Sequence, residues 1–123
     1  MINIKEFTSI GSDERGDTKS FSVKDYGQFV YLTRKAGCLS GNTYHQGLNK
    51  GTNLKTFVLV QGEITINYRK VDTTEVHTQV VPSPAVIEVS PNVVHNVMAN
   101  TDIVILENNS IDDIKADVIR EQV

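Results

Sequence analysis

Three side chains in this sequence combine residue types and positions that suit proton-transfer chemistry. His45 and His95 each stand near a tight turn in an alternating apolar run, and Lys55 begins a further apolar run. Imidazole groups titrate near neutral pH and exchange protons with a substrate, and an ammonium group stabilises a negatively charged oxygen. If the runs form neighbouring strands of one small barrel, the two imidazoles can face one cavity and make a site.

Each of these residues also has a purely structural interpretation. His45 on its own is equally consistent with a surface histidine or with a core histidine whose hydrogen bonds are satisfied. His95 lies in the apolar segment Val93–Val97, where an unpaired imidazole is costly, so it needs either a hydrogen-bond partner or a wet cavity. Lys55 at a barrel rim is ordinarily solvated, and it stabilises an anion only when it points inward.

A metal site would need more ligands than this pattern supplies. Two histidines provide half of a mononuclear site, which generally needs three or more protein ligands. The carboxylates nearest in the sequence are Glu63, Glu88 and Glu107, and none has a spacing typical of a ligand. We therefore predict no metal; if one is bound, His45 and His95 are the predicted ligands.

The composition indicates an ordinary globular domain and argues against several kinds of partner. The 123 residues predict one domain, 1–123, large enough to bury a core without metals or disulfides. A net charge of −3 argues against binding to duplex nucleic acid. Cys38 is the only cysteine, so an intramolecular disulfide is impossible, which fits a reducing compartment. Because no apolar run has membrane-spanning length and the N-terminus lacks a signal-peptide core, we expect a cytoplasmic protein without membrane contact.

Stepwise alternation of apolar and polar residues over most of the chain is typical of half-buried strands. Ile2–Phe7 is a predicted edge strand, and the apolar run Thr56–Val60 is predicted to be buried on both faces. Asn96–Ala99 and Ile103–Glu107 are predicted to form a hairpin. A single helix is predicted at about 110–121, where a capping serine precedes acidic residues and an apolar stripe. Many short strands and one terminal helix predict an all-β fold, a small antiparallel β-barrel or jelly roll.

Several short motifs follow one another in an order and spacing that point to a family. In chain order they are Ser12-Asp13-Glu14-Arg15-Gly16, Phe29-Val30-Tyr31-Leu32, Ser40-Gly41-Asn42-Thr43-Tyr44-His45, Ser83-Pro84-Ala85-Val86 and Pro91-Asn92-Val93-Val94-His95. Together they resemble the RmlC-like cupins, small β-barrels that isomerise or epimerise nucleotide-linked keto-sugars. The resemblance covers most of the chain, from about residue 9 to residue 107. Ser40–His45 and Asn100–Val104 also resemble the C-terminal cupin domain of capsular-polysaccharide epimerase/reductase proteins.

The sequence departs from the metal-binding cupins at two ligand positions. Thr43 stands where their first motif has its first histidine, His45 stands at the second histidine, and Lys55 stands at the glutamate. An ammonium group in place of a carboxylate repels a divalent cation, so the comparison disfavours a metal. The metal-free sugar epimerases carry a lysine at the position of Lys55, which implies that this residue stabilises an enolate. The loop Gly47–Asn53 is longer than either family needs, so it either covers a substrate or marks the loss of the original chemistry.

The first functional hypothesis is an enzyme that isomerises or epimerises a keto-deoxy-sugar nucleotide in surface-polysaccharide or deoxysugar biosynthesis. His45 would remove a proton next to the ketone, and Lys55 or His95 would stabilise the enolate oxygen. Tyr44 or Tyr31 would return a proton on another face of the sugar. This chemistry needs no redox cofactor, and we predict none, because the chain has no phosphate-cradling glycine loop.

Under the same hypothesis, the nucleotide sugar lies in the barrel with its diphosphate at a basic rim. Its diphosphate would lie near Arg15 or Arg34, with Tyr31 and Thr43 as further substrate contacts. The alternative hypothesis is a non-catalytic or metal-binding cupin that holds a small carbohydrate or anion without turnover, because a histidine and a glutamate of the family pattern are missing. Cupins of this kind are generally dimeric, so we expect a homodimer, to which the edge strand Ile2–Phe7 can contribute.

Overall fold

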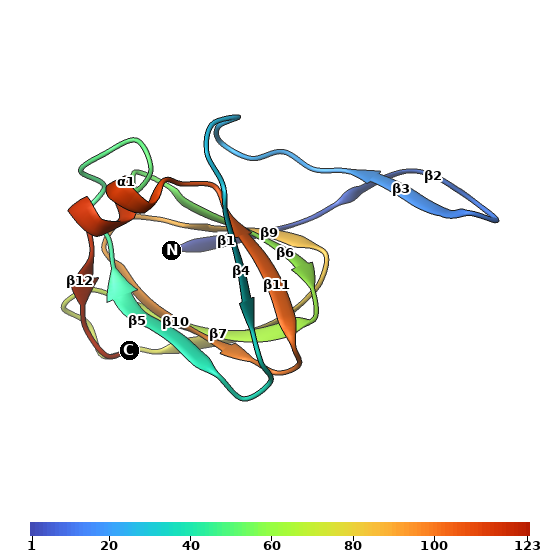
Figure 1. The fold of residues 1–123 in the computed structure, drawn as a ribbon. Helices are drawn as coiled ribbons and strands as arrows, with labels where there is room; N and C mark the ends of the chain where they lie inside the picture. The colour runs from blue at the N-terminus through green and yellow to red at the C-terminus, as the bar shows by residue number, and fades with distance from the viewer.

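Two five-stranded antiparallel sheets face each other in the computed structural model, which describes residues 1–123 (Figure 1). The strands of the first sheet are, in order, β1 (Ile2–Glu6), β9 (Ala85–Val89), β6 (Lys55–Gln61), β11 (Ile103–Glu107) and β4 (Val30–Arg34). The strands of the second are β12 (Ile119–Arg120), β5 (Leu39–Tyr44), β10 (Val93–Ala99), β7 (Glu63–Lys70) and β8 (His77–Pro82). A hairpin of β2 (Thr8–Asp13) and β3 (Gly16–Ser20) projects away from both sheets, and α1 (Ile111–Ala116) is a single short helix. The predicted all-β class with one C-terminal helix is confirmed.

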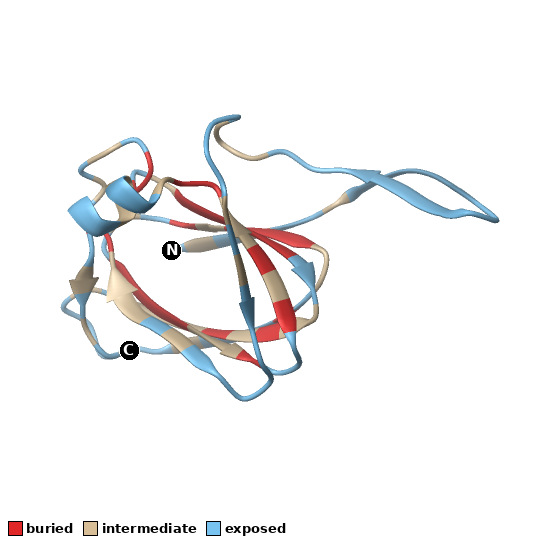
Figure 2. Cartoon of the chain, viewed as in Figure 1, coloured by how far each residue is buried: buried red, intermediate tan, exposed pale blue.

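The hydrophobic core lies between the two sheets, where the facing strands carry the buried residues (Figure 2). Alternation along β7 turns Ile64 and Ile66 inward, and both are almost completely buried. The predicted double-sided burial of β6 is confirmed from Thr56 to Leu59, whereas Val60 is 47% exposed on the outward face. The predicted edge strand is also confirmed, because β1 lies at the margin of its sheet and pairs with β9 alone.

The predicted hairpin between Asn96–Ala99 and Ile103–Glu107 is wrong. β10 pairs with β5 and β7, whereas β11 pairs with β4 and β6 in the other sheet. The turn at 100–102 therefore carries the chain from one sheet to the other. Hydrophobic alternation predicts that a segment is a strand, but it does not specify the partner, and both strands here already have neighbours on each side.

The helix is shorter than the predicted span of 110–121. Ser110 caps it as expected, because its Oγ accepts a hydrogen bond from the backbone N–H of Asp113 at 3.1 Å. The helix ends at Asp117, and the chain continues as β12, in which Ile119 and Arg120 pair with β5. The β-branched residues after Asp117 favour an extended strand, and pairing with β5 satisfies their backbone.

A β-bulge in β5 determines which of its residues face the core. Thr43 pairs with His95, but Asn96 pairs with Gly41, so Asn42 is an extra residue on the β5 side. Gly41 and Asn42 both have positive φ, at 100° and 56°. Ser40 faces inward before the bulge, and Thr43 faces inward after it. The bulge therefore shifts the inward phase of β5 by one residue.

Replacing Gly41 with alanine is expected to destabilise the protein more than the same change at Gly37. Both glycines have positive φ, so alanine strains the backbone at either site. A Cβ at position 41 would lie 3.0 Å from the carbonyl oxygen of His95 and 3.1 Å from the Cα of Asn96, whereas a Cβ at position 37 meets nothing within 4 Å. We expect this crowding to lower the free energy of unfolding of Gly41→Ala by about 1–3 kcal/mol beyond that of Gly37→Ala. Urea unfolding of the two variants measures the difference, and equal losses would show that the bulge tolerates a side chain.

Candidate active site

A cavity of about 400 Å³ lies between the two sheets, and α1 and β12 contribute to its lining. Such a volume falls within the usual range for small-molecule sites. Aliphatic side chains from both sheets line much of it, among them Ile64, Ile87 and Ile105. One group of polar lining residues comes from the ends of strands near α1. His45, Lys55, His95, Glu107 and Thr43 all line this one cavity.

His45 is buried, with one ring nitrogen hydrogen-bonded to the backbone and the other free to contact a ligand. Its Nδ1 lies 2.6 Å from the backbone carbonyl oxygen of Asp117. A carbonyl oxygen only accepts hydrogen bonds, so Nδ1 carries the proton, and Nε2 of the neutral ring has a free lone pair. Burial lowers the pKa of His45 below its usual value of 6.5, and the positive charge of Lys55 acts in the same direction. The ring is therefore neutral at pH 7 and suited to accept a proton.

His95 has the same tautomer as His45. Its Nδ1 donates a hydrogen bond to the carbonyl oxygen of Val93 at 2.9 Å, so its Nε2 is also an acceptor. Burial lowers the pKa of His95 from 6.5 to about 4. The edge of its ring meets Phe57, with the ring centroids 6.2 Å apart. At neutral pH, His95 can accept a hydrogen bond at Nε2, but it has no free N–H to donate.

The two imidazoles lie side by side on one wall of the cavity. Their ring centroids are 5.9 Å apart, and they come from the neighbouring strands β5 and β10. His45 directly follows the last residue of β5, and His95 is the third residue of β10. The predicted shared cavity for these two histidines is therefore present in the structure.

Lys55 lies on the opposite sheet and forms a buried ion pair. Its Nζ donates a hydrogen bond to Oε2 of Glu107 at 3.0 Å, and only 5% of the Lys55 side chain is exposed. The ammonium group also lies 5.5 Å from the centroid of the Phe57 ring. Glu107 compensates the buried charge, while the remaining N–H groups of the ammonium can bind another oxygen. Lys55 thus points inward, as an oxyanion-stabilising role requires.

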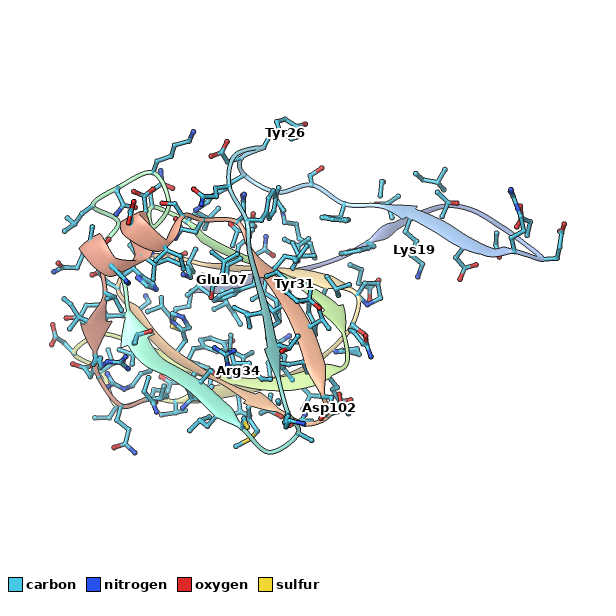
Figure 3. The ribbon with its side chains drawn as sticks, in the orientation of Figure 1. Lys19, Tyr26, Tyr31, Arg34, Asp102 and Glu107 are labelled. Carbon is cyan, nitrogen blue, oxygen red and sulfur yellow. The ribbon has the colours of Figure 1, made fainter.

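Three further cations line the cavity, and only one of them was predicted. Arg34 was a predicted diphosphate contact, and its Nε donates a hydrogen bond to Oγ of Ser40 at 3.1 Å, which joins β4 to β5. Figure 3 labels Arg34 and Glu107, whose side chains lie between β4 and β5 in this view. Lys115 and Arg120 come from the C-terminal segment and were missed. The helix is shorter than predicted and is followed by β12, and this arrangement brings both residues to the cavity. The continuous helix predicted from the sequence gave no reason to expect them there.

Three predicted site residues do not reach this cavity. Tyr44 lies on the other face of β5, because the bulge turns its neighbours on both sides inward, and it pairs with Ile119. Tyr31 is 67% exposed on the outer face of β4 (Figure 3). Arg15 lies in the turn of the projecting hairpin and pairs with Asp13 at 2.7 Å. The predicted return of a proton by Tyr44 or Tyr31 is therefore not compatible with this geometry within one chain.

The cavity lacks the donor set of a metal site. No group of three or more histidine, cysteine, aspartate or glutamate side chains is placed to hold a metal ion. Glu107 is the only carboxylate in the lining, and it is already paired with Lys55. The residues present therefore do not fit the metal of the metal-binding cupins.

In addition, no helix has the length and hydrophobicity that crossing a membrane requires.

Asp117 connects the C-terminal segment to the loop that follows His45. Its Oδ1 accepts a hydrogen bond from the backbone N–H of Gln46, and its Oδ2 accepts from those of Gly47 and Leu48, all at 2.9 Å. The hydroxyl of Thr52 also donates to Oδ2, at 2.5 Å. Burial alone would raise the pKa of this carboxyl, but the hydrogen bonds from Thr52 and the three N–H groups lower it to about 2.

The carboxylate of Asp117 is expected to make stability depend on pH in the acid range. The pKa of Asp117 is about 2 in the folded protein, whereas an aspartate in the unfolded chain has its ordinary pKa of 3.8. Because the folded value is lower, the ionised group stabilises the fold above pH 4, and this contribution, roughly 2 kcal/mol, disappears as the pH falls from 4 to 2. The difference in unfolding free energy between the wild type and Asp117→Asn should shrink over that interval in urea titrations. The exposed Asp112 of the same helix provides the control variant Asp112→Asn, and a constant gap for Asp117→Asn would contradict this assignment.

Comparisons with known proteins show which solved structures share this fold and which family the sequence matches. No curated protein sequence matches the chain. Among solved structures, the chain is similar to the capsular polysaccharide assembling protein CapF from Staphylococcus aureus, with 25% sequence identity and a TM-score of 0.65. This match covers 95% of the chain and 34% of CapF, so the chain spans about a third of the length of that protein.

Two further structures share the fold at lower identity. QdtA, a sugar 3,4-ketoisomerase from Thermoanaerobacterium thermosaccharolyticum solved in complex with TDP, is 17% identical with a TM-score of 0.73, over 98% of this chain and 88% of QdtA. The RmlC epimerase of Mycobacterium tuberculosis is 16% identical with a TM-score of 0.67, over 86% of this chain and 61% of the epimerase. The predicted RmlC-like cupin resemblance is thus confirmed. Because residues 11–117 also match the sequence profile of the polysaccharide biosynthesis C-terminal domain, the chain belongs to that family.

Proposed function

We propose that this protein isomerises a keto-sugar nucleotide, by moving a proton between adjacent carbons of the sugar, during the biosynthesis of a surface polysaccharide. One observation carries the proposal: a neutral imidazole with a free Nε2, on His45, shares a buried cavity with the inward-pointing ammonium group of Lys55. A base and an oxyanion stabiliser are the two groups that enolisation of a ketone needs. Family membership supports polysaccharide biosynthesis as the setting.

In the proposed reaction, Nε2 of His45 takes the proton from the carbon next to the ketone. The electrons of that C–H bond form a C=C bond, and the ketone oxygen becomes an enolate that Lys55 stabilises. His95 accepts a hydrogen bond from the hydroxyl group on the adjacent carbon, which it can do because its Nε2 is unprotonated. When the hydroxyl proton moves to the enolate oxygen and His45 returns its proton to the former ketone carbon, the ketone and hydroxyl have exchanged places.

The placement of the two imidazoles favours isomerisation over epimerisation. Inversion at a carbon needs a base on one face of the sugar and an acid on the other. His45 and His95 come from adjacent strands and therefore approach the sugar from one side. His95 has no N–H to give at neutral pH, and the predicted tyrosine donors lie outside the cavity. Isomerisation needs only a single base that removes and returns the proton on one face of the sugar, so it requires no proton donor on the opposite face.

The cations of the cavity lining suit the diphosphate of such a substrate. Arg34, Lys115 and Arg120 carry positive charge, and Glu107, which is paired with Lys55, is the only carboxylate among the lining residues. This local excess stands out in a chain whose net charge is −3. Guanidinium and ammonium groups bind phosphate oxygens by charge-assisted hydrogen bonds. We propose that these three residues hold the diphosphate while the sugar occupies the inner cavity.

The proposal is tested by incubating the protein with dTDP-4-keto-6-deoxyglucose in deuterated water and following the sugar by NMR. Isomerisation predicts a new keto-sugar and deuterium at the carbons that exchange protons. If related keto-sugar nucleotides bind but neither convert nor exchange, the protein is the non-catalytic binding module of the alternative hypothesis. If none of them binds, both hypotheses are wrong.

We also propose that the projecting hairpin docks on a second copy of the chain. All residues of β2 and β3 are exposed, and a lone two-stranded hairpin is marginally stable in water. The outer face of the first sheet exposes Tyr31 and Val60, which a partner hairpin can cover. Light scattering should give the mass of a dimer for the wild type and of a monomer when residues 9–19 are replaced by a short glycine-serine linker. A wild-type monomer at micromolar concentration would refute this arrangement.

A further inference from the structure

One residue outside the cavity lining holds the segment that carries His45. Asp117 makes five hydrogen bonds to residues 45–52: its backbone carbonyl accepts from the ring of His45, and its carboxylate accepts from three backbone N–H groups and from Thr52. Three of these donors belong to residues 46–48, directly after His45 in the chain. Asp117 is 3% exposed. It therefore holds both the ring of His45 and the backbone that follows it.

We propose that Asp117 is a positioning residue that keeps His45 in the tautomer with a free Nε2 aimed at the substrate. The carbonyl that accepts from Nδ1 belongs to the residue whose carboxylate is bound by four donors, so the side chain fixes the direction of that carbonyl. The helix ends at this residue, whose φ of −146° and ψ of 70° are not helical. The role in catalysis rests on the proposed function, whereas the role in selecting the tautomer does not.

The same contacts place the cation-bearing segment over the cavity. Lys115 and Arg120, on either side of Asp117 in the sequence, both contribute to the lining. Asp117 links this segment to Gln46 and to the loop Gly47–Asn53, which the sequence suggested as a cover for the substrate. The buried carboxylate of Asp117 therefore ties the loop to the segment that lines the cavity, although no residue of the loop itself belongs to the lining.

Asparagine at position 117 is the sharpest test. An amide keeps the size of the carboxylate but has one oxygen in place of two, and its NH₂ group meets backbone N–H donors instead of accepting from them. We expect the ring ¹⁵N resonances of His45 in Asp117→Asn to lose the pattern of a protonated Nδ1 and unprotonated Nε2 and to become a mixture of tautomers. Asp112→Asn removes the same charge from an exposed position of the same helix and should leave the pattern unchanged.

A second pair of variants covers the case in which Asp117→Asn fails to fold. Thr52→Val removes one of the four donors to the carboxylate and keeps the side-chain shape, whereas Thr52→Ser keeps the hydroxyl group. We expect Thr52→Val to shift the His45 ring resonances in the same direction as Asp117→Asn but less, and Thr52→Ser to restore them. Wild-type resonances in every folded variant would overturn the proposal.

Kinetics then separate positioning from a general structural role. A base misplaced by about 1 Å can slow the reaction about 10²-fold, so kcat should fall by up to that factor in Asp117→Asn while KM for the keto-sugar nucleotide changes little. Equal wild-type kcat values in Asp117→Asn and Asp112→Asn would show that Asp117 does not position the base. If no keto-sugar nucleotide reacts with the wild type, the proposed function fails, yet the NMR experiment still decides the tautomer.

Discussion

Replacing His45 with asparagine is expected to reduce conversion of the keto-sugar nucleotide, and the accompanying deuterium exchange, by about 10²–10⁴-fold. Asparagine retains an N–H group near the position of Nδ1, so it can still donate to the carbonyl of Asp117 and keep the fold. It has no group that takes a proton from carbon at neutral pH. The loss should therefore appear in kcat, with binding of the nucleotide sugar largely kept.

The measurement compares initial rates of product formation and deuterium incorporation by NMR, with substrate affinity from calorimetry. His77→Asn is the matched control, because His77 lies on β8 and is absent from the cavity lining. It stacks on Tyr68 at a centroid distance of 5.3 Å, so its replacement removes an equivalent ring without touching the site. A His45→Asn variant with wild-type turnover would assign the base to another residue and remove the central argument for this function.

Replacing Lys55 with methionine should have the second-largest effect, a loss of about 10²–10³-fold in kcat. Methionine fills a similar volume on β6 but leaves the enolate oxygen without a cation. It also leaves the carboxylate of Glu107 without its partner, and breaking a buried ion pair can cost about 3–5 kcal/mol of stability. The Glu107 side chain is 16% exposed, so solvent reduces that cost here.

A double variant separates the two consequences at Lys55. In Lys55→Met combined with Glu107→Gln, the unpaired charge is gone, so urea unfolding should show most of the lost stability restored. Turnover should stay low, because the stabilising cation is still missing. If the double variant recovers activity together with stability, then Lys55 serves the fold alone, and the negative charge of the intermediate is stabilised elsewhere.

The residues at the centre of the site could be predicted because local patterns mark them. His45, Lys55 and His95 each stand near a turn or at the start of an apolar strand, and the family resemblance supplied the expectation that those strands form one small barrel. Their partners could not be predicted. Glu107 is 52 residues from Lys55, and Asp117 is 72 residues from His45, so only the folded arrangement brings each pair together.

The errors in the prediction share a physical origin in how strands connect. Alternation identified β10 and β11 as strands, but it could not tell that the short turn between them crosses to the opposite sheet. The apolar stripe of the C-terminal segment suited a longer helix, yet the hydrogen bonds of Asp117 end it early and free β12 to extend the second sheet. In both places tertiary contacts determined the structure: the strand partners in the first and the end of the helix in the second. The contacts of the C-terminal segment also bring Lys115 and Arg120 to the cavity.

The bulge at Asn42 has a consequence for how the wall of this cavity can change in evolution. If β5 ran on from Ser40 in regular alternation with all of its residues and no bulge, Tyr44 would point inward and His45 would point to the outer face. A cavity lined by a phenol in place of an imidazole would have lost its base while keeping every other residue. The backbone conformation at Gly41 and Asn42, as much as the identity of the residues that follow, thus decides whether an imidazole or a phenol faces the cavity.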